Sequence, residues 1–257
     1  MPAPAYIERI IPDRFAGQTV IVPGAGSGIG LAVALRVARE GARVIAVDLD
    51  PARLDALRSA HPELDLVTVP ADISAEAEVQ RIVAACAGRC DALANNAGIM
   101  DGFEPAGEVS DAVWERVLRV NVTGTLRMSR AVLPLMLAAG KGSIVNVVSV
   151  AGLIGGAAGA AYTTSKHAVI GLTRSTAFMY EPDGIRVNAV APAGVATNIV
   201  AEFASQRAEQ RLGPRMQVAT RQAQPEETAA TIAFLLSDDS PNVNGAILPS
   251  DGGWTAF

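Results

Sequence analysis

Short apolar runs alternate with longer stretches of helical spacing along the whole chain. The first of these runs, QTVIVP, is β-branched, and such residues fit the pleated surface of a buried strand. The runs predict strands at 18–23, 42–48, 64–70, 91–98, 142–149, 184–192 and 246–253. Between them, apolar residues recur every three or four positions, and Asp50-Pro51 has the residue types of a helix start. Helices are therefore expected near 28–41, from 51 onward, and near 75–88, 111–139, 162–181, 197–211 and 225–237.

The alternation of strands and helices predicts an α/β fold with a parallel, doubly wound sheet. Several predicted strands are almost continuously apolar, as expected when helices cover both faces. No linker composition or internal repeat divides the 257 residues, so we expect a single domain over 1–257. Ligands of such sheets bind beyond the carboxyl ends of the strands.

Composition and charge narrow the classes of function. Half of the residues are hydrophobic, the formal net charge is −5, and no cluster of Lys or Arg is present. This argues against nucleic acid as a partner. The start MPAPAYIERI lacks the pattern of a signal peptide, and the apolar runs are too short or too broken by Gly to span a membrane. We therefore expect a cytoplasmic protein with no membrane partner.

Metal chemistry is not expected. The chain has two histidines, His61 and His167, which argues against a histidine-based zinc site. Its two cysteines, Cys86 and Cys90, lie in CAGRC and are expected to be reduced thiols rather than a disulfide or a metal site.

A glycine-rich loop follows the first predicted strand. PGAGSGIG places Gly24, Gly28 and Gly30 between a strand and a helix. Glycines there permit a tight turn and a close approach of phosphate oxygens to the backbone. The helix that begins near Ser27 would direct its free N–H groups and its dipole at an anion. The spacing G-x-x-x-G-x-G differs from the usual dinucleotide fingerprint, and a plain strand-to-helix turn remains an alternative.

Asp48 ends the second predicted strand. A carboxylate at this place can accept hydrogen bonds from an adenosine ribose diol and would repel a 2′-phosphate. No Arg or Lys lies within 23–30 or 49–52 to offset that repulsion. NAD is therefore predicted over NADP, with a simple turn residue before Asp50 as the alternative.

Tyr162 and Lys166 form a candidate proton-transfer pair. Lys166 is one of two lysines in the chain and lies in an apolar, Ala- and Gly-rich region. Spacing of i, i+4 places both side chains on one face of a helix. A nearby ammonium favours the phenolate and would lower the tyrosine pKa, so the pair could move a proton to or from a substrate oxygen. Ordinary helix surface is the alternative.

Two further polar residues are candidates. Ser149 ends the fifth predicted strand, where its hydroxyl could donate to a substrate oxygen or simply close a turn. Asn121 lies within the helical pattern of 111–139, where it is a mild anomaly because asparagine is a mediocre helix former.

Taken together in order, these motifs resemble the short-chain dehydrogenase/reductase family, in its compact single-domain branch. The matching segments, which span essentially the whole chain, are VPGAGSGIG, Asp48, ADIS, NNAG, NVTG, Ser149, YTTSK, PAGVAT and NGAILPSDGG. The resemblance implies a Rossmann-type sheet of seven strands in the order 3-2-1-4-5-6-7 and, commonly, a homotetramer. It also implies that Tyr162 is the general acid/base and that Ser149 orients the substrate oxygen. Lys166 would lower the tyrosine pKa and hold the nicotinamide ribose, and Asn121 would support a water-linked proton path.

The resemblance further implies which residues hold the cofactor. The glycine loop would bind the pyrophosphate, Asp48 the adenosine ribose, and the 72–73 pair the adenine. NNAG would brace the sheet, and 195–197 would meet the carboxamide. The implied set is Gly24, Ser27, Gly28, Ile29, Gly30, Asp48, Asp72, Ile73, Asn95, Ala97, Gly98, Tyr162, Lys166, Val195 and Thr197.

Two positions depart from the family pattern. Pro23 stands where the family usually has Thr, which removes a hydroxyl and a backbone N–H at the strand end. Ala193 stands where it usually has Gly, and its methyl group is expected to crowd or fix the nicotinamide loop. Neither residue belongs to the proposed chemistry.

The predicted activity is NAD-dependent hydride transfer with a small-molecule secondary alcohol or ketone, apolar or cyclic. Substrate contacts are expected from 98–107, 150–161 and 197–217, the last as a mobile helical lid. Ile154, Val200 and Phe203 would form an apolar wall, and Trp254 and Phe257 would pack at a subunit interface or cover the chain itself. A lyase or epimerase, or a nucleotide-binding protein without catalysis, remains the alternative.

Overall fold

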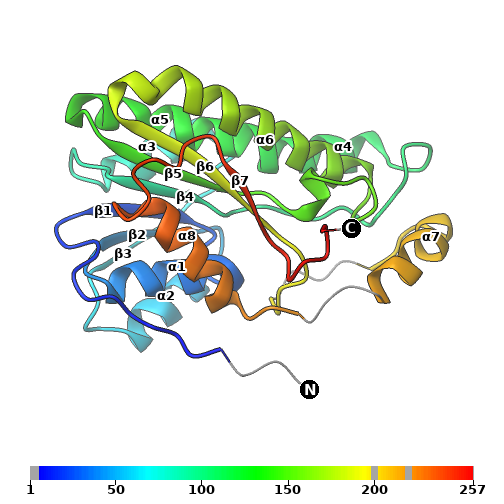
Figure 1. Ribbon diagram of the computed structural model, residues 1–257, viewed down its shortest axis with the longest axis horizontal. Helices are drawn as coiled ribbons and strands as arrows, with labels where there is room; N and C mark the ends of the chain where they lie inside the picture. The colour runs from blue at the N-terminus through cyan, green and yellow to red at the C-terminus, as the bar shows by residue number, and fades with distance from the viewer. Residues whose placement is uncertain (1–5, 198–201, 218–221, 257) are drawn as a thin grey trace.

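The fold is a single parallel sheet between two layers of helices (Figure 1). The computed structural model describes residues 6–197, 202–217 and 222–256. Within these ranges seven strands pair in the order β3-β2-β1-β4-β5-β6-β7, which confirms the predicted fold class and strand order. The strands are β1 (Thr19–Pro23), β2 (Arg43–Asp48), β3 (Leu66–Pro70), β4 (Ala92–Asn95), β5 (Gly142–Val147), β6 (Ile185–Pro192) and β7 (Ile247–Ser250).

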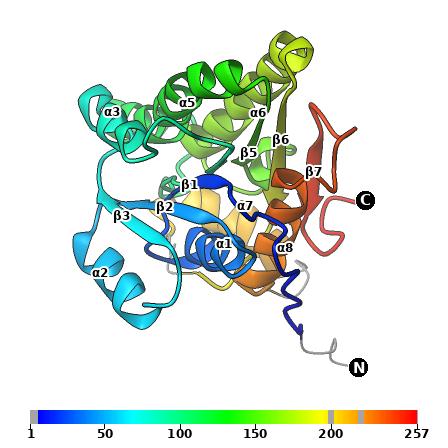
Figure 2. The same cartoon turned by 90° about the vertical axis from the view of Figure 1, so that its left-hand side faces the viewer.

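Helices cover both faces of the sheet (Figures 1 and 2). One face carries α1 (Gly28–Arg39), α2 (Pro51–Ala60) and α8 (Pro225–Leu236). The other carries α3 (Glu76–Ala84), α4 (Asp111–Leu118), α5 (Thr125–Ala139) and α6 (Ala160–Tyr180). The remaining helix, α7 (Gln206–Gln217), lies apart from both layers (Figure 1).

The strands separate two hydrophobic cores. Val20 and Val22 of β1 pack with α1 and α8, whereas Ile21 between them packs with α3 and α5. This alternation follows from the period of two in a strand. It also explains why the strands read as continuous apolar runs, since each face meets its own helix layer. Within the described ranges, no helix combines the length and apolar character needed to span a bilayer.

Helix starts follow their capping residues. Asp50 accepts a hydrogen bond from the N–H of Ala52 at 2.9 Å, with Pro51 as the first helical residue, as the sequence predicted. The helix predicted at 197–211 instead begins at Gln206. The reason is Ser205, whose hydroxyl accepts from the N–H of Ala208 at 3.1 Å and caps α7.

Two other predicted helices differ from the structure. The segment 111–139 is not one regular helix, because a π-helical stretch, η1 (Arg119–Gly124), separates α4 from α5. The helix predicted at 75–88 ends at Ala84, and the chain turns at Ala87 and Gly88, which both have positive φ. Trp254 is buried within its own chain, whereas Phe257 lies outside the described residues.

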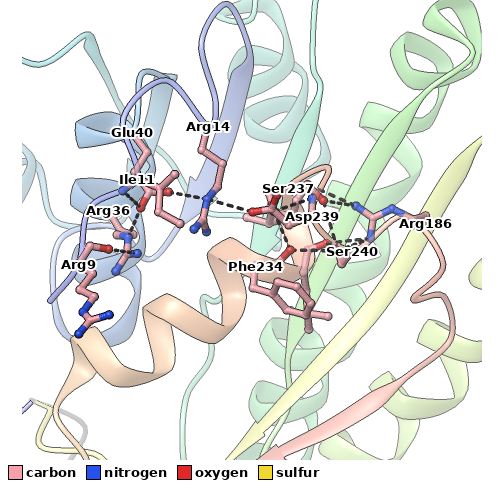
Figure 3. Close-up of polar contacts among 12 residues, drawn as sticks. Arg9, Ile11, Arg14, Arg36, Glu40, Arg186, Phe234, Ser237, Asp239 and Ser240 are labelled. Atoms are coloured by element: carbon pink, nitrogen blue, oxygen red, sulfur yellow. Dashed lines mark hydrogen bonds and ion pairs between the residues drawn. The ribbon is translucent and has the colours of Figure 1, made fainter.

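A buried carboxylate joins the N-terminal segment to the helix layer (Figure 3). Glu40, with no exposed surface, accepts from the N–H of Ile11 at 3.0 Å and pairs with Arg36 at 2.5 Å. Arg14 lies 3.4 Å from Glu40 and 3.4 Å from Asp239 beyond α8, so it bridges the two helices. These contacts tie the residues before β1 to both α1 and the end of α8.

The replacement Glu40→Gln is expected to lower the free energy of unfolding by about 3 kcal/mol, because it removes the buried negative charge that Arg36 and Arg14 share. Urea unfolding followed by circular dichroism measures the effect. Glu63→Gln, at an exposed position, is the matched control and should change little. An unchanged unfolding midpoint in Glu40→Gln would contradict a stabilising role for the network.

Arg186 closes the carboxyl end of α8 (Figure 3). Its guanidinium donates to the carbonyls of Leu235 and Ser237 at 2.9 and 2.8 Å and to the Ser240 hydroxyl at 3.0 Å. A cation there satisfies the last carbonyls of the helix and opposes its dipole. The end of α8 is thereby fixed to β6.

Candidate active site

The glycine loop forms a cradle after β1. Gly24 and Gly28 have φ of 77° and 55°, a region that glycine enters without steric cost. A Cβ on Gly30 would lie 2.0 Å from the carbonyl oxygen of Gly24, so no side chain fits there. Ser27 precedes α1 and makes no side-chain cap, which leaves the first N–H groups of the helix for a ligand. These features fit a pyrophosphate, and Ile29 follows in the first turn of the same helix.

Asp48 lies at the rim of this cradle. Its carboxylate accepts from the N–H of Gly26 at 2.9 Å and from that of Asp50 at 3.0 Å, which fixes its orientation. Arg53 is also close to the glycine loop. A Cβ placed on Gly26 would lie 2.8 Å from the Cβ of Arg53. The guanidinium of Arg53 pairs with Asp50 at 3.3 Å. This cation lies one residue beyond the range 49–52, in which no Arg or Lys occurs, and helical spacing from Asp50 turns it toward the loop.

The residues after β3 line the same edge of the sheet. Asp72 accepts from the N–H of Ser74 at 2.7 Å and follows the strand directly. Ile73 is buried, and its side chain packs against Gly124 of η1. The contact of residues 72–73 with adenine stays a prediction. Because the Ile73 side chain is buried, such a contact would involve Asp72 and the backbone of this pair.

NNAG braces the centre of the sheet. Asn95 is buried and donates to the Ser129 hydroxyl at 3.0 Å and to the side-chain Oδ1 of Asn146 at 2.9 Å, which joins β4 to α5 and β5. Asn96 donates to the carbonyls of Pro23 and Gly24, both at 3.4 Å. The turn after β1 is thus held by an amide from the neighbouring strand, although Pro23 carries no hydroxyl.

The segment 193–197, which is the predicted nicotinamide loop, lies against the glycine cradle. Thr197 approaches Gly28, where a Cβ would meet its side chain at 3.0 Å. Val195 forms a parallel bridge with Ala223. On either side of that bridge, Ala196 donates to the Ala223 carbonyl at 2.9 Å, and Ala223 donates to the Gly194 carbonyl at 2.9 Å. Ala193 is partly exposed at the start of this loop.

Asn121 lies inside the π-helical stretch and is 1% exposed. Its side chain exchanges two hydrogen bonds with the backbone of Ile99, at 2.8 and 2.9 Å, and donates to the Ser165 hydroxyl of α6 at 3.1 Å. The loop after Ala97 and Gly98 is thereby held to α6, and Gly98 faces both Asn121 and Lys166. Single π turns are frequent at functional sites, which gives the anomalous asparagine a structural reason.

Tyr162 and Lys166 share one face of α6, as their spacing predicted. The ammonium of Lys166 lies 5.3 Å from the centre of the Tyr162 ring and donates to the Val147 carbonyl of β5 at 3.0 Å. Lys166 is 5% exposed. Ser149, just beyond β5, accepts from the N–H of Ala151 at 3.1 Å, and its side chain is hydrogen-bonded to Tyr162. The three side chains therefore meet at the carboxyl edge of the sheet.

The electrostatics of the pair correct one sequence expectation. Burial raises the pKa of Tyr162 to about 12; the hydrogen bond with Ser149 lowers it, and the negative charge of Asp101 raises it further. Burial lowers the pKa of Lys166 to about 8. In the polypeptide alone the phenol pKa is thus raised rather than lowered, because loss of water is the largest cause of the shift and the Lys166 charge is not among its causes. At neutral pH Tyr162 is a phenol that can donate a proton.

Comparisons with known proteins agree with this arrangement. Residues 24–255 match a family model described as enoyl-(acyl carrier protein) reductase. The short-chain dehydrogenase/reductase olcF of Penicillium canescens is 40% identical over 93% of this chain and 97% of that protein. The chain belongs to the short-chain dehydrogenase/reductase family. Members of this family are oxidoreductases that bind a nicotinamide cofactor.

Other relatives and solved structures cover almost the whole chain. The 3beta-hydroxysteroid dehydrogenase 2 of Eggerthella lenta is 40% identical over 94% of this chain and 96% of that protein. The crystal structure of levodione reductase is 36% identical, with a TM-score of 0.87 over 95% of this chain and all of that one. A putative NAD(P) dependent gluconate 5-dehydrogenase from Beutenbergia cavernae, solved with NADP at low occupancy, is 38% identical, with a TM-score of 0.83 over 96% of this chain and all of that one.

In this short-chain dehydrogenase/reductase an apolar cluster joins the loop after β4 to the helix α7. Phe103 packs on Phe203 with 4.6 Å between ring centroids, and both meet Ala208 and Leu212 of the helix α7. The predicted role of Phe203 in an apolar wall is compatible with this packing. Ile154 is partly exposed in the loop after Ser149, and Val200 lies outside the described residues.

The remaining sequence candidates carry no visible metal chemistry. Among the residues that the structure describes, no three His, Cys, Asp or Glu side chains gather as metal ligands would. Cys86 and Cys90 are both buried and free.

Asp101 is a buried carboxylate beside the start of α6, and no sequence motif indicated it.

Proposed function

We propose that this short-chain dehydrogenase/reductase transfers hydride between the nicotinamide of NAD and a secondary alcohol or ketone. The observation that carries the proposal is the convergence of Ser149, Tyr162 and Lys166 on the edge of the sheet that also holds the glycine cradle. A ligand that spans from the cradle to these side chains would pass Asp48 and the nicotinamide loop. That path fits a dinucleotide.

Each of the three side chains has a distinct part in the proposed reaction. Bound nicotinamide would supply or accept the hydride. In ketone reduction, Tyr162 donates its phenolic proton to the substrate oxygen, and Ser149 donates a hydrogen bond that stabilises the developing negative charge. In alcohol oxidation the proton moves in the reverse direction, onto the tyrosine oxygen. Lys166 supplies a positive charge near that oxygen and would hold the nicotinamide ribose.

Proton exchange with solvent would use Lys166 and Asn121. With a pKa of about 8, Lys166 gives up a proton far more easily than an exposed lysine does. Asn121 connects the loop after β4 to α6 beside it and would support a water-linked path. Buried groups of this kind match their pKa to the pH at which they exchange protons.

The proposed substrate is apolar or cyclic. Phe103, Phe203 and Leu212 form an apolar cluster between the loop after β4 and α7. The names of two relatives give a hydroxysteroid and levodione as their substrates. The proposal includes a homotetramer in the cytoplasm; light scattering of the purified protein checks its mass.

The test measures reduced nicotinamide by absorbance with NAD and a panel of cyclic and open-chain secondary alcohols, and the reverse reaction with the ketones. We expect turnover with at least one alcohol and its ketone. If no redox turnover occurs while an alcohol is dehydrated or epimerised, a lyase or epimerase on the same scaffold replaces this proposal. If the protein binds NAD and converts none of these compounds, it is a nucleotide-binding protein instead.

The replacement Asp48→Asn is expected to lower the ratio of kcat/KM for NAD over NADP by about tenfold or more, because it removes a charged acceptor for the ribose diol and the repulsion of a 2′-phosphate. Initial rates with each cofactor measure the ratio. Asp55→Asn on the exposed side of α2 is the control and should leave the ratio unchanged. A wild-type protein that prefers NADP would show that Arg53 outweighs Asp48.

A further inference from the structure

Asp101 is a buried carboxylate in the loop after β4, outside the glycine cradle and the catalytic trio. It is 3% exposed, and both of its oxygens accept hydrogen bonds from backbone N–H groups. One oxygen accepts from Phe103 at 3.1 Å and from Gly159 at 3.2 Å, and the other accepts from Tyr162 at 2.8 Å. Burial of a charged group costs free energy unless the group is hydrogen-bonded in this way. We therefore ask what these contacts of Asp101 do for the fold.

The first function of these contacts is to cap the helix that carries Tyr162. Gly159 is the N-cap residue of α6 and has no side chain with which to cap it. Asp101 reaches from another element to the N–H of Tyr162, the third residue of the helix, where an N-cap side chain would normally bond. A Cβ on Gly159 would lie 2.5 Å from the Asp101 carboxylate, so this glycine leaves room for the carboxylate. The N–H of Ala160 donates to the Glu104 carbonyl at 2.8 Å and strengthens the same junction.

The second function concerns Phe103, which is buried and has a φ of 60°. A bulky residue rarely adopts this conformation, and the surrounding contacts must hold it there. The hydrogen bond from its N–H to Asp101 is one such contact. The conformation sets the Phe103 ring against Phe203, and the adjacent Gly102 carbonyl accepts from the N–H of Ala204 at 2.9 Å. The segment that leads into α7 is therefore docked on the turn that Asp101 stabilises.

We propose that Asp101 is a positioning residue that fixes Tyr162 relative to the apolar cover formed by Phe103, Phe203 and α7. One carboxylate joins the first turn of the catalytic helix to the turn that receives the cover. The distance between Tyr162 and the apolar cover is thus fixed. The kinetic consequences of this proposal rest on the proposed function. The positioning of the helix and the turn by Asp101 does not depend on it.

The charge of Asp101 gives a readout that a purely structural role would not move. Its negative charge is one cause, after burial, of the raised pKa of Tyr162. Oxidation of an alcohol needs the deprotonated tyrosine oxygen, so its rate increases with pH toward that pKa. Removing the charge at constant size should therefore move the midpoint of the oxidation profile to lower pH.

The decisive variant is Asp101→Asn, compared with Asp55→Asn on exposed α2 as the matched control. An amide retains one acceptor but turns N–H groups toward backbone N–H groups. We expect kcat to fall about 10- to 100-fold, since small displacements of a reacting group have effects of that size. We also expect KM to rise, the oxidation midpoint to move to lower pH, and the amide of Tyr162 to exchange hydrogen at least about tenfold faster. Wild-type exchange, kcat and pH midpoint in Asp101→Asn would overturn the proposal.

A second variant separates the two contacts and serves if Asp101→Asn does not fold. Phe103→Gly accepts the positive φ without strain and removes the ring that meets Phe203. It should raise KM and speed amide exchange at 202–204, with the Tyr162 amide and the pH midpoint as in wild type. An unchanged KM and unchanged exchange would exclude Phe103 as the link to the cover. If the wild type shows no hydride transfer, the proposed function fails, and the exchange measurements still decide the role of Asp101.

Discussion

Replacement of Tyr162 by phenylalanine is expected to lower kcat about 10²- to 10⁴-fold, the usual contribution of a positioned general acid or base. The phenol is hydrogen-bonded to Ser149, and the centre of its ring lies 5.3 Å from the Lys166 ammonium, so removal of the hydroxyl leaves the substrate oxygen without its proposed proton donor. Affinity for NAD should change little, because the glycine cradle and Asp48 stay intact. Steady-state kinetics in both directions, together with fluorescence titration of NAD, measure these two effects.

Tyr180→Phe is the matched control, since it makes the same change at the far end of the same helix. In the wild type, oxidation should become faster as the pH rises above neutrality, because burial holds the Tyr162 pKa at about 12 and the reaction needs the deprotonated oxygen. Reduction needs the protonated phenol and should not require alkaline pH. Full turnover in Tyr162→Phe would remove the acid/base assignment.

Replacement of Lys166 by methionine is expected to lower kcat/KM for alcohol oxidation about 100-fold, within the range for loss of a charged group in an active site. Lys166 supplies a positive charge beside the Tyr162 ring in the proposed site, and the other lysine of the chain is the exposed Lys141. Without that charge the phenolate is harder to form. Initial rates with NAD and the best alcohol measure the loss.

The same variant should change how stability depends on pH. The pKa of Lys166 is lowered from 10.5 to about 8 by burial, so its charged form costs folding free energy below about pH 8. That cost diminishes as the pH rises through 8 toward 10.5, so the group makes the wild type more stable with increasing pH. Between about pH 7 and pH 10 the wild type should gain about 2 kcal/mol relative to Lys166→Met in urea unfolding.

Lys141→Met is the control for both measurements. Lys141 is the other lysine of the chain; its ammonium is largely exposed and pairs with Asp238 at 2.7 Å. It should show neither the loss of activity nor the relative change in stability. A Lys166→Met variant that keeps wild-type kcat/KM would show that the charge is not needed for the proposed chemistry.

The strands could be predicted from the sequence because most of them are apolar, β-branched runs that end in a turn. Helix limits were harder where a local contact decides them. The cap of α7 by Ser205 and the positive φ of Ala87 depend on single residues that leave no periodic signal. The π stretch around Asn121 left only a weak trace, an asparagine in a helical pattern.

The candidate site, like the fold, was predictable from the sequence in some parts and not in others. Short motifs predicted which side chains meet at the carboxyl edge, because that edge collects the ends of all parallel strands. They did not predict the direction of the Tyr162 pKa, which depends on how much water the fold excludes. The positions of Asp101 and Arg53 near the site were not predicted either. Asp101 contacts backbone groups, and Arg53 contacts a loop, that come close only in the folded chain.

The bridge between Val195 and Ala223 has a consequence for how such an enzyme can diversify. It pins both ends of the segment that contains α7 at one point beside the sheet. Lengthening a loop whose ends are already fixed is cheap, at about 0.6 kcal/mol for each doubling. The segment can thus be exchanged or extended as a module, and new substrates can be selected without redesign of the nucleotide-binding scaffold.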